Sequence, residues 1–128
     1  MNNNENKTNI NWYPGHMAKT KREIEKLMPI IDIVYELLDA RIPYSSKLLD
    51  INKIIKNKAR ILIMTKKDLC DLEITNKWVD FYKKEGYYVL LINLNDEKDY
   101  QKIITLTKEL VLDINNKRVA KGLKEKEI

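Results

Sequence analysis

The chain has 128 residues, of which 44% are hydrophobic and 34% are charged, and its formal net charge is +5. This length and composition are typical of one globular domain with its own core. The positive charge permits a polyanionic partner such as RNA without requiring one. The single cysteine, Cys70, excludes an internal disulfide, and one cysteine with one histidine exclude a zinc site built from these residue types.

Residues 1–10 are polar and rich in asparagine, which predicts a disordered tail rather than a signal peptide. Pro14-Gly15 predicts a turn, and apolar residues at helical spacing predict an amphipathic helix from Ala18 to Leu27 that Pro29 ends. No apolar stretch approaches about 18 residues, so the sequence predicts no membrane span, and we expect a cytoplasmic location.

Three apolar runs predict strands. Asp32 to Leu38 predicts a buried strand that leads into a loop at residues 39–43. Residues 60–64 are too few for a helix and rich in isoleucine, which is typical of a buried parallel strand. Tyr87 to Ile92 predicts the third strand, and the polar residues 93–96 predict a loop after it.

Helices are predicted between these strands. Ser45-Ser46 can cap the first of them. Its buried face contains Leu48, Ile51, Ile54 and Ile55. The next helix has one apolar face, which we expect in the core, formed by Ile74, Trp78, Phe81 and Tyr82. Gly86 is its predicted C-cap.

A long last helix is predicted over residues 100–114, and the polar, basic stretch from Asn115 predicts a linker or exposed extension. The order is therefore one helix followed by three strand–helix pairs. This order predicts an α/β fold in three layers, with a parallel sheet between helices. Ligands of such sheets bind just past the carboxyl ends of the strands, where Thr65 to Asp68 lie.

The four residues Thr65-Lys66-Lys67-Asp68 carry groups that suit guanine. A carboxylate can accept two hydrogen bonds from the guanine edge, whereas adenine has no such donor pair and would leave Asp68 unpaired. The stem of Lys66 can lie on a flat base while its ammonium stays in water. A charged turn after a strand is the alternative interpretation of these residues.

A nucleotide hydrolase also needs a phosphate cradle. The glycines of this chain, Gly15, Gly86 and Gly122, form neither a Gly-x-x-x-x-Gly-Lys-[Ser/Thr] loop nor an Asp-x-x-Gly loop. Two charge-assisted bonds to a base contribute about 1.5–3 kcal/mol each, and association costs roughly 4 kcal/mol or more. We therefore expect the chain alone to bind GTP weakly, in the millimolar range at best, and not to hydrolyse it.

Three segments together resemble the N-terminal half of the ribosome biogenesis GTPase A family. They are Asn11 to Lys19, which contains Trp-Tyr-Pro-Gly-His-Met, Asp32 to Pro43, which contains Asp-Ala-Arg-Ile-Pro, and Thr65 to Asp68. That family is circularly permuted, so its guanine-reading motif precedes its phosphate loop and switch motifs. The resemblance implies a partial P-loop GTPase domain of the Ras-like, circularly permuted type.

The resemblance also implies an organisation and a site. Residues 11–116 correspond to the base-recognition half of the domain, and residues 117–128 to a basic linker toward a phosphate-loop half outside this chain. The implied contacts of GTP or GDP are Thr65, Lys66, Lys67, Asp68, Asn93 and Leu94. The implied partners are the large ribosomal subunit and its rRNA. Mg²⁺ is implied only for an intact parent protein, and no residue of this chain is predicted to bind a metal.

The resemblance makes His16 a candidate for orienting the attacking water in an intact parent. Packing beneath Trp12 and Tyr13 is its alternative role. The sequence departs from the family at Thr65, where asparagine is usual, and in the second base loop. There Leu94 replaces a serine, so a contact with the guanine carbonyl must come from a backbone N–H.

Two other functions stay open. One is a non-enzymatic ribosome- or rRNA-binding module that uses the basic first helix and tail while the base loop is vestigial. The other is an α/β fragment without activity of its own, whose exposed sheet edge requires partner strands. Arg41 likewise has two interpretations: it reaches a phosphate or RNA, or it links its own loop to a helix end. No oligomeric state is predicted.

Overall fold

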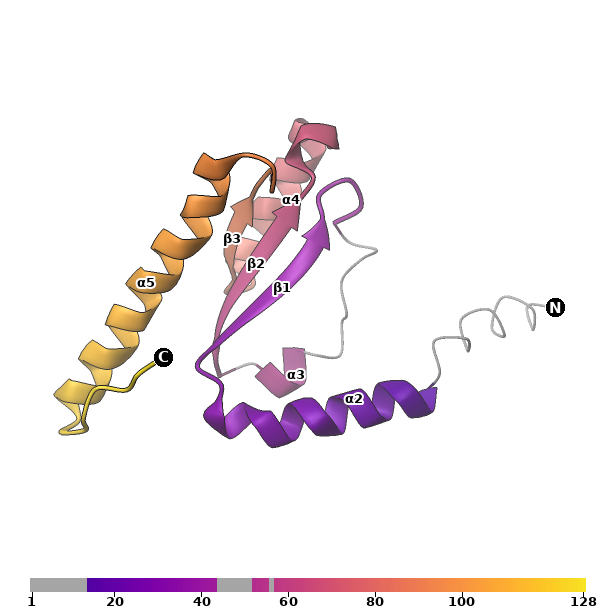
Figure 1. Cartoon of the computed structure of the whole chain (residues 1–128). Coiled ribbons are helices and arrows are strands. Elements are labelled where there is room, and N and C mark those ends of the chain that lie inside the picture. Colours follow the sequence, from indigo (N-terminus) through magenta and orange to yellow (C-terminus); the bar gives the residue numbers. More distant parts are fainter. Residues whose placement is uncertain (1–13, 44–51, 56) are drawn as a thin grey trace. The chain divides into compact units, whose positions relative to one another are not determined.

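The computed structural model describes residues 14–43, 52–55 and 57–128 (Figure 1). The chain divides into two units, one with residues 1–31 and 48–57 and the other with residues 32–47 and 58–128. The predicted tail at residues 1–10, the cap Ser45-Ser46 and the apolar residues Leu48 and Ile51 lie outside the described residues. Within the described ranges, no helix is both long and apolar enough to cross a membrane.

The first unit contains two helices joined in sequence to the second unit. Their bounds, with the 3₁₀ turn η1, are α2 (Pro14–Leu27), η1 (Met28–Ile30) and α3 (Asn52–Ile55). The predicted turn at Pro14-Gly15 is wrong, because α2 already begins at Pro14; proline suits the first helical position, where its missing N–H has no intrahelical partner. Pro29 ends α2 as predicted, since the α-helix stops at Leu27.

The second unit is a three-stranded parallel sheet between two helices (Figure 1). The strands are β1 (Ile33–Asp39), β2 (Ala59–Thr65) and β3 (Tyr88–Leu91), in the order β1-β2-β3. Helix α4 (Leu72–Lys84) packs on one face, and α5 (Glu97–Ala120) packs on the other. The predicted three-layer α/β fold with a parallel sheet is confirmed.

The core is built on β2, the central strand, whose residues Ile61 to Met64 are at most 5% exposed. Leu62 and Met64 point toward α4, where they pack with Val79 and Tyr82. Ile61 and Ile63 point toward α5 and pack with Leu110. Full burial of each such side chain stabilises the fold by about 1.5–3 kcal/mol, which is why this strand organises the unit.

Helix α4 buries a different face from the predicted one. Thr75, Val79 and Tyr82 are buried, whereas Ile74 and Phe81 are about half exposed, at 54% and 47%. Core positions for Ile74 and Phe81 are therefore a wrong prediction. The apolar residues of α4 lie on more than one face of the helix, and packing against the sheet determines which of them are buried.

The C-terminal end of α4 is capped at Gly86, as the sequence predicts. Gly86 has φ +98, its N–H donates to the Lys83 carbonyl at 3.1 Å, and the Tyr87 N–H donates to the Tyr82 carbonyl at 3.1 Å. This pair of bonds is a Schellman motif, which needs a residue with positive φ after the helix. The motif turns the chain directly into β3.

β1 is an edge strand of the described sheet and is not fully buried as predicted. Tyr35 is 44% exposed and Leu37 is 63% exposed, on the face that α5 covers only in part. Side chains alternate along a strand, so the opposite face of β1 still places Leu38 in the core. An apolar run alone does not distinguish a central strand from an edge strand.

The stretch from Asn115 onward is more ordered than a linker. Helix α5 continues to Ala120, and the residues after it turn back along the helix. The Asn115 side chain donates to the Lys126 carbonyl at 3.1 Å and accepts from the Lys126 N–H at 2.8 Å. The Lys126 ammonium lies 2.9 Å from the Asp32 carboxylate. Residues 116–126 are thus mostly exposed, as predicted, but those up to Ala120 belong to α5 and the ones after it are held against the helix.

Candidate functional site

The carboxyl ends of the three strands meet at one rim of the sheet (Figure 1). The register pairs Asp39 with Thr65 and Met64 with Leu91, so the loops after these strands are neighbours. This rim therefore brings together both segments of the predicted base site, residues 65–68 and residues 93–94. In open α/β sheets it is the usual location of ligands.

Thr65 joins the ends of β1 and β2. Its hydroxyl donates to the Leu38 carbonyl at 3.2 Å, and its carbonyl accepts from the Ala40 N–H at 2.8 Å. These two bonds connect the end of β1 to the end of β2 at the rim. Thr65 thereby holds in place the start of the base loop, residues 65–68.

Lys66 adopts the left-handed backbone conformation, with φ +62 and ψ +36. Among the described residues it is the only one other than glycine with positive φ. This conformation costs an ordinary residue roughly 1–2 kcal/mol, and such strain is concentrated at functional sites. The turn it produces lets the Lys67 N–H donate to the Ile92 carbonyl at 3.1 Å, which ties the two base loops together.

Asp68 lies in the short 3₁₀ turn η3 (Lys67–Leu69) and is exposed at the rim. The Leu69 N–H donates to the Lys66 carbonyl at 3.0 Å, which closes the turn. No hydrogen bond or ion pair of the Asp68 carboxylate is found within the described part of the chain. Both carboxylate oxygens are therefore available to accept donors from a ligand.

The second loop, at Asn93 and Leu94, is held by a buried carboxylate. Asp99 is 6% exposed, accepts the Asn93 N–H at 2.9 Å and pairs with the Lys102 ammonium at 2.9 Å. The bond from the Asn93 backbone, followed by the one from Lys102, holds the pKa of Asp99 below its usual value. The loop is thereby anchored to the first turn of α5.

The Asn93 side chain is used within its own loop, because its amide oxygen accepts the Asn95 N–H at 3.0 Å. The Leu94 side chain is half exposed. Its backbone N–H has no acceptor among the residues that the structure describes. Of the two predicted contacts, Leu94 is thus the one whose backbone N–H is unused, because the Asn93 N–H donates to Asp99.

Asp39 is a member of the rim that sequence reasoning missed. Its carboxylate accepts from the Arg41 backbone N–H at 2.9 Å, from the Arg41 Nη2 at 2.7 Å and from the Lys66 ammonium at 3.1 Å. The hydrogen bonds from Arg41, more than the one from Lys66, hold the pKa of Asp39 well below its usual range. The sequence signal for this role is an acidic residue at the last position of β1, the strand that pairs with β2, which leads into the base loop.

Arg41 therefore binds within its own loop, and among the described residues it makes no link to a helix end. The link to α4 is made by other groups. The Thr75 hydroxyl donates to the Ala40 carbonyl at 2.9 Å, and the Tyr82 hydroxyl donates to the Pro43 carbonyl at 3.1 Å. These bonds fix the Asp39 loop against the helix that follows the base loop.

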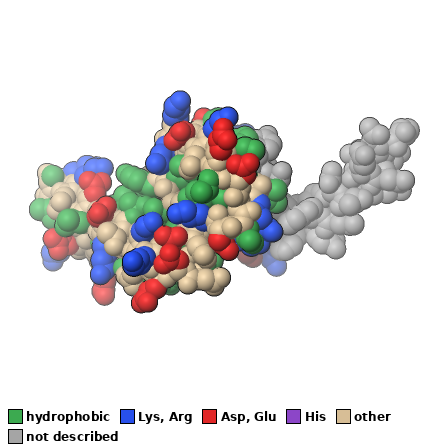
Figure 2. All heavy atoms as spheres, turned by 90° about the horizontal axis from the view of Figure 1, so that it is seen from above, with side chains coloured by type: hydrophobic (Ala, Val, Ile, Leu, Met, Phe, Trp, Pro, Cys, Tyr) green, Lys and Arg blue, Asp and Glu red, His purple; other side chains and the backbone are tan. Residues whose placement is uncertain are grey.

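The backbone of His16 is in α2, but its side chain, like Trp12 and Tyr13, lies outside the described residues. Within the described ranges, no three acidic, histidine or cysteine side chains cluster to hold a metal ion. Figure 2 looks onto the end toward which the strands point, and there it shows basic, acidic and apolar side chains intermixed.

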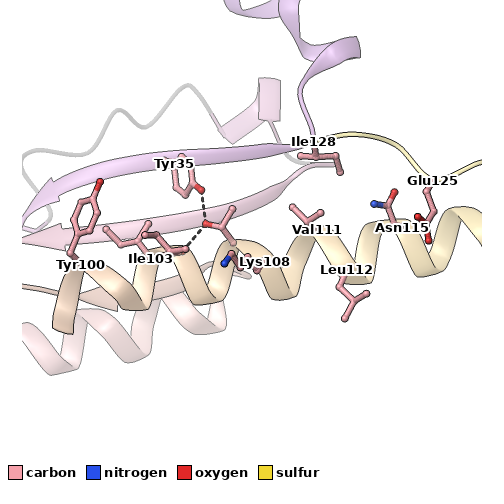
Figure 3. A pocket seen from close by; sticks show the side chains of 11 residues that line it. Tyr35, Tyr100, Ile103, Lys108, Val111, Leu112, Asn115, Glu125 and Ile128 are labelled. Atoms are coloured by element: carbon pink, nitrogen blue, oxygen red, sulfur yellow. Dashed lines mark hydrogen bonds between the residues drawn. The ribbon is translucent and has the colours of Figure 1, made fainter. Parts of the chain in front are cut away.

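A groove of about 660 Å³ lies on the α5 face of the sheet and not among the base loops. Tyr35 reaches from β1 toward α5, where its hydroxyl bonds that of Thr107, and Ile128 lies along the same groove (Figure 3). None of the six predicted nucleotide contacts lines this groove. It is therefore separate from the candidate base site.

Comparison with known proteins identifies the family. The chain is 44% identical over 116 residues to the ribosome biogenesis GTPase A of Priestia megaterium and 43% identical over 119 residues to that of Bacillus licheniformis. The chain belongs to the ribosome biogenesis GTPase A family. These alignments cover 91% and 93% of the chain, so the resemblance extends across nearly all of it.

The chain spans about two fifths of the length of these ribosome biogenesis GTPase A relatives, with 40% and 42% covered. It is also 30% identical over 101 residues to the mitochondrial ribosome-associated GTPase 1 of Bos taurus, a match that covers 78% of the chain and 30% of the relative. No family model matches the chain. Its fold is consistent with a partial GTPase domain of this family.

Proposed function

We propose that the rim of this sheet recognises the guanine base of GTP or GDP, as part of a GTPase that acts in assembly of the large ribosomal subunit. The single observation that carries the proposal is the exposed Asp68 carboxylate, which has no partner in the described structure and follows a strained Lys66. The names of the relatives support the wider role.

In this proposal Asp68 accepts two hydrogen bonds from the guanine edge. The Lys66 stem covers the base, while Thr65 and Lys67 hold the loop through their backbone and side-chain bonds. The free Leu94 N–H supplies a donor for the guanine carbonyl, and Asn93 shapes the loop that presents it. Each charge-assisted bond contributes about 1.5–3 kcal/mol.

Residues 11–116 are proposed as the base-recognition half of the GTPase domain, with residues 117–128 leading toward a phosphate-binding half. The sequence contains no phosphate loop, so hydrolysis is proposed only for an intact parent, where His16 is a candidate for orienting water. Mg²⁺ is likewise proposed only for the intact parent.

The test is an amide NMR titration of the whole chain with GMP, AMP and XMP at millimolar concentration. We expect shifts at residues 66–68 and 94, with GMP bound at least several-fold more tightly than AMP. Asp68→Asn should exchange the preference for GMP to one for XMP, because an amide can donate to the carbonyl that xanthine carries in place of the amino group.

Asp80→Asn is the matched control, since it removes an exposed carboxylate of α4 outside the rim and should leave the preference for GMP unchanged. Equal binding of GMP and AMP to the unmodified chain would refute the guanine proposal.

A second candidate is a non-enzymatic rRNA-binding module. It is favoured by the exposed basic side chains of α2, among them Lys19, Arg22 and Lys26. Such binding would weaken steeply with salt and would not depend on guanine nucleotide. A filter-binding assay with rRNA at increasing salt, with and without GMP, separates the two candidates.

A further inference from the structure

Asp39 connects two loops at the rim through one carboxylate. Its Oδ2 accepts from Arg41 Nη2 at 2.7 Å on its own loop and from Lys66 Nζ at 3.1 Å on the base loop. Lys66 lies 27 positions later in the chain, and the β1–β2 register brings it beside Asp39. The carboxylate thus contacts the residue whose backbone turn presents Asp68.

Arg41 prepares Asp39 for this contact. The Arg41 Nε donates to both carboxylate oxygens, at 3.0 Å and 3.2 Å, and the Arg41 backbone N–H donates to Oδ1. These bonds fix the plane of the carboxylate, and they keep it ionised because they depress its pKa. The Asp39 side chain is only 17% exposed, whereas that of Lys66 is 49% exposed.

Lys66 needs such a restraint. A lysine side chain has several rotatable bonds, and ordering it against a ligand costs conformational entropy at the moment of binding. In this structure the Lys66 ammonium lies 3.1 Å from the Asp39 carboxylate. This ion pair and the left-handed backbone restrict both ends of the lysine stem.

We propose that Asp39 is a positioning residue for guanine recognition, which acts by holding the Lys66 side chain and its left-handed turn in the conformation that binds the base. This inference rests on the proposed function of the rim. It assigns base selectivity to Asp68 and affinity for any flat base to the Asp39–Lys66 pair. The two roles therefore separate in experiment.

The experiment is a double-mutant cycle of Asp39→Asn and Lys66→Met in the whole chain, with GMP and AMP as probes and amide NMR as the readout. Lys66→Met keeps the unbranched apolar stem and removes the ammonium. Each single variant should weaken GMP binding by about threefold, and the double variant should be no weaker than either single variant. The ratio of GMP to AMP affinity should stay that of the unmodified chain.

Asp113→Asn is the matched control, because it breaks an exposed aspartate–lysine pair on α5, with Lys117 at 3.0 Å, and should change nothing in the titration. Arg41→Gln tests whether Asp39 acts on GMP binding through Lys66, because the Asp39–Lys66 contact can still form in this variant. A larger loss at Arg41→Gln than at Asp39→Asn would mean that the Arg41 loop acts on the base without Asp39 and would overturn the inference.

Unchanged GMP affinity in Asp39→Asn, or additive losses in the double variant, would also overturn it. If the unmodified chain does not prefer GMP to AMP, the guanine proposal fails instead. Positioning is then judged from the ligand-free amide shifts of residues 66 and 67, which both single variants should move alike. Should Asp39→Asn fail to fold, Asp39→Glu replaces it and should weaken GMP binding in the same direction.

Discussion

Asp39 and Thr65 are register partners at the last positions of β1 and β2, and the Ala40 N–H continues their pairing by donating to the Thr65 carbonyl at 2.8 Å. This pairing aligns the ends of two strands whose loops are far apart in the sequence. As a result, the Asp39 carboxylate at the end of β1 reaches Lys66 in the base loop after β2. The candidate site is a consequence of the register.

The two adjacent aromatic residues of α4 should differ sharply in their contribution to stability. Tyr82→Ala removes a ring that is 2% exposed and packs against Tyr87, and it should lower the free energy of unfolding by about 3–5 kcal/mol. Phe81→Ala, at a half-exposed position, should lower it by about 1 kcal/mol or less. Urea unfolding followed by circular dichroism measures both. Equal losses would contradict the burial described for α4.

The turn after α4 should not tolerate a side chain at Gly86. Its φ of +98 is strained for alanine whatever the space, although a methyl group there would lie 3.8 Å from its nearest neighbour, the Arg60 guanidinium. Gly86→Ala should therefore lower the free energy of unfolding, measured by urea unfolding, by about 1–2 kcal/mol. Lys77→Ala, on the exposed side of the same helix, serves as the control and should change it by no more than about 0.5 kcal/mol.

The Asp99 carboxylate should make stability depend on pH in the acid range. Its pKa is lowered in the folded chain, so its contribution is complete above the pKa of an unfolded aspartate, about 3.9, and is lost as the pH falls through the lower folded pKa. Asp99→Asn should flatten this part of the profile. The measurement is the urea midpoint between about pH 2 and pH 6, and an unchanged slope in the variant would exclude Asp99 as its source.

The Lys126 amide should lose its protection through a single change at Asn115. Asn115→Ala removes both bonds to the Lys126 backbone, so the Lys126 amide should exchange hydrogen much faster. Amides of the central strand, residues 61–64, should keep their protection, because the tail is not part of that core. Asn116→Ala, at the exposed neighbouring position, should leave the Lys126 amide unchanged.

Several elements could be predicted from local patterns alone. The isoleucine-rich run of β2, the apolar run of β3 and the glycine after α4 each carry their own signal, because strand burial and positive φ restrict residue type at those positions. The base loop at residues 65–68 was found for a similar reason, since its chemistry lies within four consecutive residues.

The sequence by itself thus determined the order of the strands and helices, the three-layer parallel fold and the position of Asp68 after the central strand. Only the tertiary structure decided which face of α4 is buried, that β1 stays exposed along Tyr35 and Leu37, and that Asp39 holds Lys66. The physical reason is the distance along the sequence over which each kind of signal acts. Periodicity and turn chemistry act between near neighbours, whereas these contacts join residues that only the parallel register and the packing of α4 and α5 bring together.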